Sequence, residues 1–394
     1  MLLRLPRLSR RAAIALVAGV AIFAVACGSA ATGGTTAPNR ADVPGELDPT
    51  INLISNWRTD FSKHSVDLGD FLSGGPPKDG IPALSGAPLV SVAEANAYAI
   101  DREPVIAVNI NGDARAYPLG ILTRHEIAND VIGGVPVAIT FCPLCNSAIV
   151  FNRVLDGVTL DFGVSGVLRN SDLVMFDRQT ESWWQQFTGE AVVGELTGSF
   201  LDIVPSSIVS WADFRATYPD GQVLSRDTGF GVDYSFNPYV DYDSDESPFL
   251  FRGEIDPRLS PIERVAAVEL NGDPIAYPFS VLEEIRLVED TVGGQPIVVF
   301  FQPGTASALD DLVIAESRDV GAVGVFVPEA AGRSLTFRVE GDDIFDNETG
   351  TRWNILGKGV EGPLAGEELT LVEHGSHFWF AWAAFNPDTR VFEG

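Results

Sequence analysis

The chain has 394 residues, with 26 Lys and Arg against 54 Asp and Glu, so its formal net charge at pH 7 is −28. This acidity argues against binding to nucleic acid, whose phosphates need Lys and Arg, and against electrostatic attachment to an anionic membrane surface. Hydrophobic residues make up 45% and charged residues 20%, which is typical of a globular chain. Three cysteines are too few for a disulfide framework. The length suits two domains or one duplicated domain.

The first 27 residues predict a secretion signal. Four arginines between positions 4 and 11 precede an apolar run over 12–26, which is too short to span a membrane comfortably. The run ends in Ala24-Val25-Ala26-Cys27, which resembles the lipobox of bacterial lipoproteins, where the cysteine is lipidated. We therefore expect a signal peptide over 1–27, lipid attachment at Cys27 and a flexible tether over 28–45. The protein would then be a lipoprotein on the extracytoplasmic face of a membrane in the cell envelope; ordinary secretion is the alternative.

The rest of the chain predicts an internal duplication. Asn111-Gly112-Asp113, followed by Ala116-Tyr117-Pro118, recurs 160 residues later as Asn271-Gly272-Asp273, followed by Ala276-Tyr277-Pro278. The same offset relates further pairs: Asp130 and Asp290, Gly133 and Gly293, Pro136 and Pro296, Phe141 and Phe301, and Ser147 and Ser307. So many matches at one offset predict two copies of one unit. We assign 46–227 to the first copy, 228–261 to a connector and 262–394 to the second copy.

Local patterns in the first copy predict strands joined by tight turns and two short helices. The Asn-Gly pair favours a hairpin, Pro118 a helix start, and Ser210 a helix cap. The expected elements are strands 105–110 and 113–117, a helix 119–128, a strand 135–141, a hairpin of 148–153 with 158–164, and a helix ending at 216. The expected fold class is α+β, mainly antiparallel β, with two copies of one duplicated unit packed together.

One motif carries possible chemistry. Cys142 and Cys145 form a C-x-x-C pair at the end of an expected buried strand, and His125 lies on the preceding helix. Two thiols and one imidazole are suitable ligands for copper or zinc. Glu126 could orient the imidazole or add a ligand. We therefore predict a metal site at His125, Cys142 and Cys145, with copper ahead of zinc, for metal binding or delivery.

The second copy lacks this set. At the offset of 160, Ile285, Gln302 and Thr305 stand in place of the histidine and the two cysteines. The Phe, Pro, Ser and Ala matches around them remain, so the framework does not need the three residues. Their joint absence is expected if they act as one site.

Other interpretations stay open. The same cysteines could exchange thiol and disulfide as a redox pair, or form a structural disulfide in a non-catalytic envelope scaffold. Met175, His374 and His377 are further candidate ligands, although core packing explains the methionine as well. Arg169 with Asp172 could form an ion pair or a substrate anchor.

Several ordered blocks also resemble one known family. They include Asp79-Gly80-Ile81-Pro82-Ala83-Leu84, His125-Glu126-Ile127-Ala128-Asn129-Asp130, Phe141-Cys142-Pro143-Leu144-Cys145-Asn146 and Asp177-Arg178-Gln179-Thr180. Together they are similar to the family catalogued as domain of unknown function 3179. The resemblance implies a secreted or membrane-anchored microbial protein, often a lipoprotein. It carries over His125, Cys142 and Cys145 as the family's distinctive polar positions; Arg124 departs from the pattern, which has an aromatic residue there.

Overall fold

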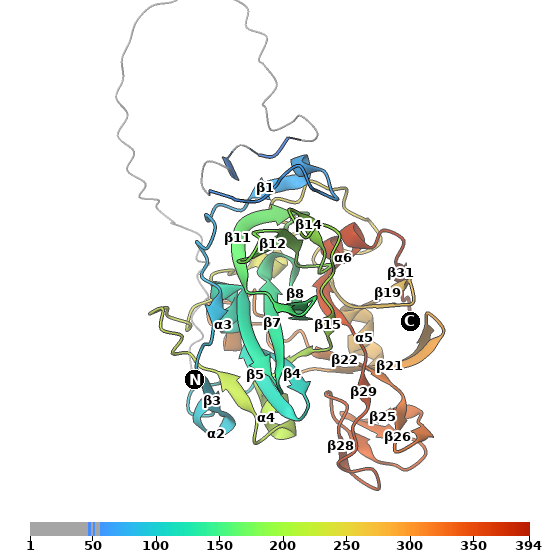
Figure 1. Ribbon diagram of the computed structural model, residues 1–394. Helices are drawn as coiled ribbons and strands as arrows, with labels where there is room; N and C mark the ends of the chain where they lie inside the picture. Colours follow the sequence, from blue (N-terminus) through green and yellow to red (C-terminus); the bar gives the residue numbers. More distant parts are fainter. Residues whose placement is uncertain (1–45, 49, 52–55) are drawn as a thin grey trace, which may run out of the picture. The chain divides into compact units, whose positions relative to one another are not determined.

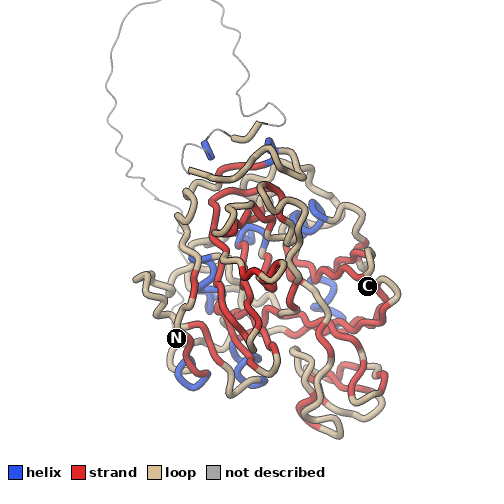
Figure 2. The backbone as a smooth tube through the Cα atoms, in the orientation of Figure 1, coloured by secondary structure: helices blue, strands red, loops and turns tan. Residues whose placement is uncertain are grey.

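Strands make up most of the regular structure, as Figure 2 shows, and their pairing is mainly antiparallel. The computed structural model describes residues 46–48, 50–51 and 56–394. The predicted signal peptide, the tether and Cys27 lie outside the described residues. Within the described part of the chain, no helix is long and apolar enough to cross a membrane. The expectation of a mainly antiparallel fold with a few helices is confirmed.

The first segment, residues 46–227, holds three five-stranded sheets (Figure 1). One sheet has the order β16 (Ser207–Ser210), β4 (Pro104–Ile110), β5 (Asp113–Pro118), β17 (Gln222–Leu224) and β3 (Leu89–Ser91). The next has β15 (Ile203–Val204), β8 (Ser147–Asn152), β7 (Val135–Cys142), β6 (Ile127–Ile132) and β2 (Leu84–Ser85). The third has β1 (Phe71–Ser73), β11 (Phe162–Arg169), β12 (Asp172–Asp177), β13 (Trp183–Gln185) and β14 (Ala191–Val193).

Short helices and one extra hairpin complete this segment. They are η2 (Leu68–Asp70), α2 (Val92–Ala95), α3 (Leu119–His125), η3 (Pro143–Cys145), α4 (Trp211–Thr217), and the pair β9 (Val154–Leu155) and β10 (Val158–Thr159). The side chain of Ser210 accepts a hydrogen bond from the backbone N–H of Asp213, which confirms the predicted cap of α4.

Two predictions for the first segment were wrong in extent. The helix expected over 119–128 ends at His125, because Glu126 adopts a positive φ of 58° and Ile127 begins β6. The hairpin around Asp156-Gly157 joins only the two-residue strands β9 and β10. β11 starts a new hairpin with β12 instead.

The second segment, residues 262–394, contains three four-stranded sheets. The order of elements in two of them is similar to that in the first two sheets of the first segment. The first two are β30 (Gly375–Phe378), β18 (Arg264–Leu270), β19 (Asp273–Pro278), β31 (Arg390–Val391), and β20 (Leu287–Val292), β21 (Gln295–Gln302), β22 (Ala322–Val327), β29 (Thr370–Leu371). The third is β25 (Phe337–Glu340), β26 (Asp343–Asp346), β27 (Arg352–Trp353), β28 (Gly359–Glu361), with the pair β23 (Glu329–Ala330) and β24 (Arg333–Ser334). The helices are α5 (Phe279–Ile285), η5 (Ile314–Glu316) and α6 (Trp379–Phe385), and η4 (Tyr242–Ser244) lies in the connector.

The largest hydrophobic core contains residues of both segments. Phe141 and Trp184 of the first segment belong to it, together with Phe378 and Trp382 of the second. The amide of Asn146, directly after the C-x-x-C motif, donates a hydrogen bond of 3.1 Å to the carbonyl of Ser376. The candidate motif is therefore held at a place where the two segments are packed against each other.

Candidate metal centre

The two cysteines lie in the sharp connection between β7 and β8. Cys142 ends β7 and pairs in register with Ser147, the first residue of β8. Between them runs the one-turn helix η3, which begins at Pro143, and Asn146 then reverses the chain with a positive φ of 50°. Both cysteine side chains are buried, with exposed fractions of 2% and 0%, and neither is in a disulfide. The connection therefore holds two free thiols inside the core.

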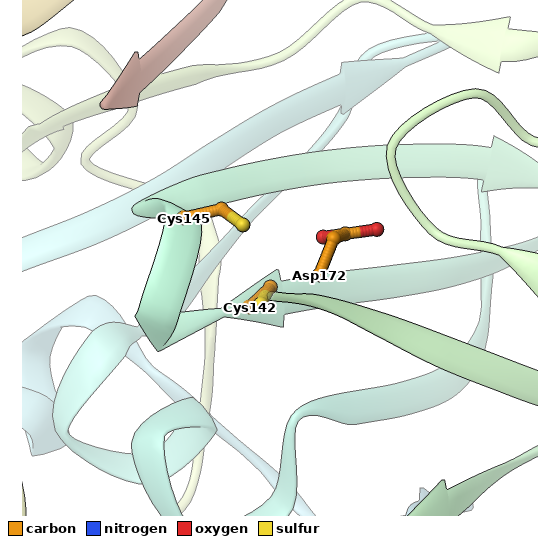
Figure 3. Close-up of side chains that lie close together, drawn as sticks. All are labelled: Cys142, Cys145 and Asp172. Carbon is orange, nitrogen blue, oxygen red and sulfur yellow. The ribbon is translucent and has the colours of Figure 1, made fainter. Parts of the chain in front are cut away.

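A third acidic group reaches this place from the β11–β12 hairpin. Asn170 and Ser171 form the two-residue turn, both with positive φ, which is the backbone of a type I′ hairpin. The turn brings the carbonyl oxygen of Ser171 to 3.5 Å from Sγ of Cys145. It also places Asp172 beside both cysteines, so that the two sulfur atoms and a carboxylate oxygen all lie within 4.8 Å of one another. Figure 3 shows these three side chains meeting at one spot.

One oxygen of Asp172 is free to take a ligand. Oδ2 accepts hydrogen bonds from Nε2 of Gln185 at 2.6 Å and from the backbone N–H of Phe187 at 3.0 Å. Oδ1 is buried and accepts no hydrogen bond from an N–H or O–H group among the described residues, so only the thiols of Cys142 and Cys145 can donate to it. A buried carboxylate oxygen with only such weak donors is costly. A bound cation would remove this cost.

Burial governs the protonation of these groups. It raises the pKa of both thiols, that of Cys145 well above its usual range. It also raises the pKa of Asp172 to about 7, and the pKa of Glu126 to about 8 with a further contribution from the charge of Asp172. The charge of Asp172 raises the pKa of Glu126 and of both thiols, and a metal ion would stabilise the charged forms of these groups.

A cavity of about 390 Å³ lies near the cluster. Glu126, Leu144, Tyr239 and Tyr242 are among the residues that line it, whereas the two cysteines and Asp172 are not. The hydroxyl of Tyr242 donates a hydrogen bond of 3.0 Å to the carbonyl of Leu144, which lies between the two cysteines. The connector, to which both tyrosines belong, therefore contacts the C-x-x-C motif and forms part of the cavity wall.

His125 has other partners. Its Nδ1 lies 2.7 Å from the carbonyl oxygen of Pro82, and its Nε2 lies 2.5 Å from the hydroxyl of Tyr234. Nδ1 therefore donates to Pro82, and Nε2 accepts from the tyrosine. Burial lowers the pKa of the ring. The structure brings Cys142 and Cys145 together as predicted, but the third group beside them is Asp172 rather than His125.

The other predicted ligands lie elsewhere, apart from Glu126, which lines the cavity. Met175 is fully buried on β12, where it pairs with Val164 and Trp184. His374 and His377 line a different cavity, described below. Cys27 is not among the described residues.

Sequence reasoning missed Asp172 as a site residue. It considered the residue only as a partner for Arg169; the two are paired across the hairpin backbone, but the ion pair of Arg169 is with Asp70, at 3.6 Å. The usable signal was Asn170-Ser171 between two β-branched, apolar runs, which is a hairpin turn that could return the chain to the cysteines. The spacing of residues in the sequence does not show which other strand packs against this turn.

A family model described as protein of unknown function (DUF3179) matches residues 78–389. The chain therefore belongs to this family, as the resemblance predicted. No curated protein and no solved structure matches the chain. The family description names no activity, so the chemistry has to be argued from the site itself.

Proposed function

We propose that this protein is an extracytoplasmic, lipid-anchored metal-binding protein whose ligands are Cys142, Cys145 and Asp172. One observation carries the proposal: two sulfur atoms and a carboxylate oxygen lie within 4.8 Å of one another in a fully buried spot. A cluster of acids is expensive to bury unless a cation compensates for it. Oδ1 of Asp172, which has only the two thiols as donors, supports the same conclusion.

The donor set favours zinc over copper. Thiolates suit both Zn²⁺ and Cu(I), whereas a carboxylate oxygen suits harder ions. Zn²⁺ accepts Cys sulfur and Asp oxygen in the same site. With Asp172 as the third donor in place of the predicted imidazole, zinc becomes the first candidate and copper the second.

Glu126 is the candidate for a fourth ligand. It lines the neighbouring cavity, and its pKa responds to the charge of Asp172. A site with three protein ligands leaves one coordination position for a further side chain or a small ligand. This supports metal binding or delivery.

Thiol–disulfide exchange is less well supported. A reactive thiol is partly exposed and has a lowered pKa. Cys142 and Cys145 are buried, and burial raises the pKa of both. An inert disulfide would also leave Oδ1 of Asp172 without a partner.

The location and the duplication remain part of the proposal. The lipobox-like Ala24-Val25-Ala26-Cys27 supports anchoring on the extracytoplasmic face of a membrane. The repeated sequence blocks support two copies, 46–227 and 262–394, of which only the first keeps the cysteines. The strand registers agree: Ile110 pairs with Asp113, and Leu270 with Asp273.

Metal analysis of the full-length protein tests the proposal. We expect about one zinc ion per chain, because the three donors form one site. The double variant Cys142→Ser/Cys145→Ser should retain no zinc. Loss of a residue that only hydrogen-bonds to a metal ligand weakens metal binding about tenfold or more, and Asp172→Asn should weaken zinc binding by at least that factor. His125→Gln is the matched control and should keep the ion. Wild-type protein without stoichiometric metal, carrying a disulfide that resists mild reductant, would overturn the proposal.

A further inference from the structure

A second cavity, of about 320 Å³, lies between the two segments. We call it the junction cavity. Residues of β8 and β15 line it from the first segment, and residues of β18, β30 and α6 line it from the second. Its lining includes Phe187, Glu269, Glu373, His377, Trp382 and Phe385. No residue lines both this cavity and the one beside the cysteines.

The charge of the junction cavity is negative. Glu269 and Glu373 line it, and none of its lining residues in the described chain is Lys or Arg. Burial, and then the charge of Glu269, raise the pKa of Glu373. The two carboxylates therefore repel each other, and a cation between them would be stabilised by both.

The rest of the wall is aromatic. The rings of Phe187 and Phe385 stack with centroids 4.6 Å apart, and those of His377 and Trp382 are parallel at 6.0 Å. Aromatic faces attract organic cations, above all quaternary ammonium groups. Phe385 already has such a contact, because the guanidinium of Arg169, which does not line the cavity, lies 5.9 Å from the centre of its ring.

His377 adds an unused polar atom. Its side chain is 4% exposed, and its Nδ1 has no hydrogen-bond partner among the residues described. Burial lowers the pKa of the ring to about 3, so it is neutral at pH 7 and does not oppose a cationic ligand. An unpartnered buried nitrogen in the wall of a cavity indicates a missing hydrogen-bond partner.

We propose that the junction cavity binds a small organic cation, a quaternary ammonium or a protonated amine. The two carboxylates balance its charge, the aromatic rings contact its apolar surface, and Nδ1 of His377 is available to a polar group on it. The proposal is independent of the metal site, since neither its residues nor its charge involve the cysteines.

Isothermal titration of the full-length protein with choline tests this, with the uncharged isostere 3,3-dimethylbutan-1-ol as the control ligand. We expect choline to bind at least about tenfold more tightly than the isostere, because only choline gains from the carboxylates and the ring faces. Equal binding of the two compounds, or no binding of choline, tetramethylammonium or butylamine, would overturn the proposal.

Variants then locate the binding. The change Glu269→Gln/Glu373→Gln should weaken choline binding by about tenfold or more. The matched control Glu283→Gln/Glu284→Gln removes the same charge from exposed positions on α5 and should leave binding unchanged. Cys142→Ser/Cys145→Ser should also bind choline normally, which keeps this test separate from that of the metal site. Circular dichroism and an unchanged urea midpoint would show that the double Gln variant is folded, and unchanged choline binding by that variant would contradict the assignment.

Discussion

In both segments, a tyrosine on one strand donates a hydrogen bond to an aspartate on the next strand along the chain. Tyr117 lies 2.6 Å from Oδ2 of Asp130, and Tyr277 lies 2.8 Å from Oδ2 of Asp290. In each case the helix between these strands ends at a residue with positive φ, 58° in the first segment and 66° in the second. The polar contacts that hold the framework are therefore the same.

The segments differ where the framework meets the candidate site. The residue at the helix end is Glu126 in the first segment and Arg286 in the second, where Nε donates to the carbonyl of Phe301 at 3.0 Å. Gln302 stands at the position of Cys142, and its amide donates to Asp213 at 2.8 Å.

The hairpin that delivers Asp172 differs as well. Strands β11 and β12 have eight and six residues, whereas β25 and β26 have four each. The second segment thus lacks the cysteines, the facing acid and the longer hairpin together. Because the shared framework forms without them, folding does not require the acidic cluster, which supports the proposed metal site.

The largest expected effect is that of zinc on stability. Zinc at roughly a thousand times its Kd should raise the free energy of unfolding by about 4 kcal/mol, less any contribution from zinc bound by the cysteines of the unfolded chain. Cys142→Ser/Cys145→Ser should abolish the gain. Gln302→Ser/Thr305→Ser changes the equivalent positions of the second segment and should keep it. Urea unfolding with and without zinc measures this, and an equal gain in the cysteine variant would place the ion elsewhere.

The next-largest effect on stability is expected at a buried hydrogen-bonded aspartate that is present in both segments. Asp177 and Asp346 are fully buried and accept hydrogen bonds of 3.0 Å from the indole N–H groups of Trp184 and Trp353, and each also binds a threonine three residues later. Asp177→Ala and Asp346→Ala should each lower the free energy of unfolding by about 3 kcal/mol, because several buried donors lose a charged acceptor. Denaturant midpoints check this. A large cost in one segment and none in the other would show that the contact is not equivalent.

The framework could be predicted from sequence because its signals are local. The Asn-Gly pairs define two hairpins whose registers are as expected, and the apolar run 135–141 is β7. The C-x-x-C motif is local too, and it identified Cys142 and Cys145. The helix end at Glu126 was missed because its positive φ depends on the strand that follows, not on a Gly or Pro signal.

The remaining candidate ligand could not be predicted because it comes from a distant hairpin. Asp172 is 27 residues beyond Cys145, and only the packing of β12 against the β7–β8 connection brings it there. His125 is close to the cysteines in sequence, but it is not the third group beside them in the structure. The backbone turns at Glu126, and the imidazole is held by Pro82 and Tyr234 instead.

A strongly acid-sensitive group is expected in the second segment. His377 has a folded-state pKa of about 3 against its usual 6.5, so the unfolded chain takes up the proton first as the pH falls. The buried neutral ring therefore does not lower the free energy of unfolding well above pH 6.5. As the pH falls below 6.5, the free energy of unfolding decreases progressively, by about 2 kcal/mol at pH 5. His377→Gln should reduce the loss of stability between pH 7.5 and pH 5 by that amount. His64→Gln, at an exposed position of the first segment, should not. Identical pH profiles for wild type and His377→Gln would contradict the lowered pKa.

The smallest expected effect comes from the tyrosine hydroxyls, and it is unequal. Asp130 also accepts a hydrogen bond of 2.8 Å from Nη1 of Arg115. The residue at the equivalent position in the second segment is Ile275, which cannot donate one. Tyr117→Phe therefore leaves the carboxylate with a charged partner and should cost about 0.5 kcal/mol, while Tyr277→Phe should cost about 1 kcal/mol.

A double-mutant cycle tests this inequality directly. If Arg115 compensates for the lost hydroxyl, Tyr117→Phe should cost about 1 kcal/mol in an Arg115→Ile background, as Tyr277→Phe does where the arginine is naturally absent. Urea unfolding of the four proteins gives the coupling energy. The same small cost in both backgrounds would mean that solvent, and not Arg115, satisfies Asp130, because the carboxylate is partly exposed. The difference between the two segments at this contact would then lie in their exposure to water rather than in the arginine.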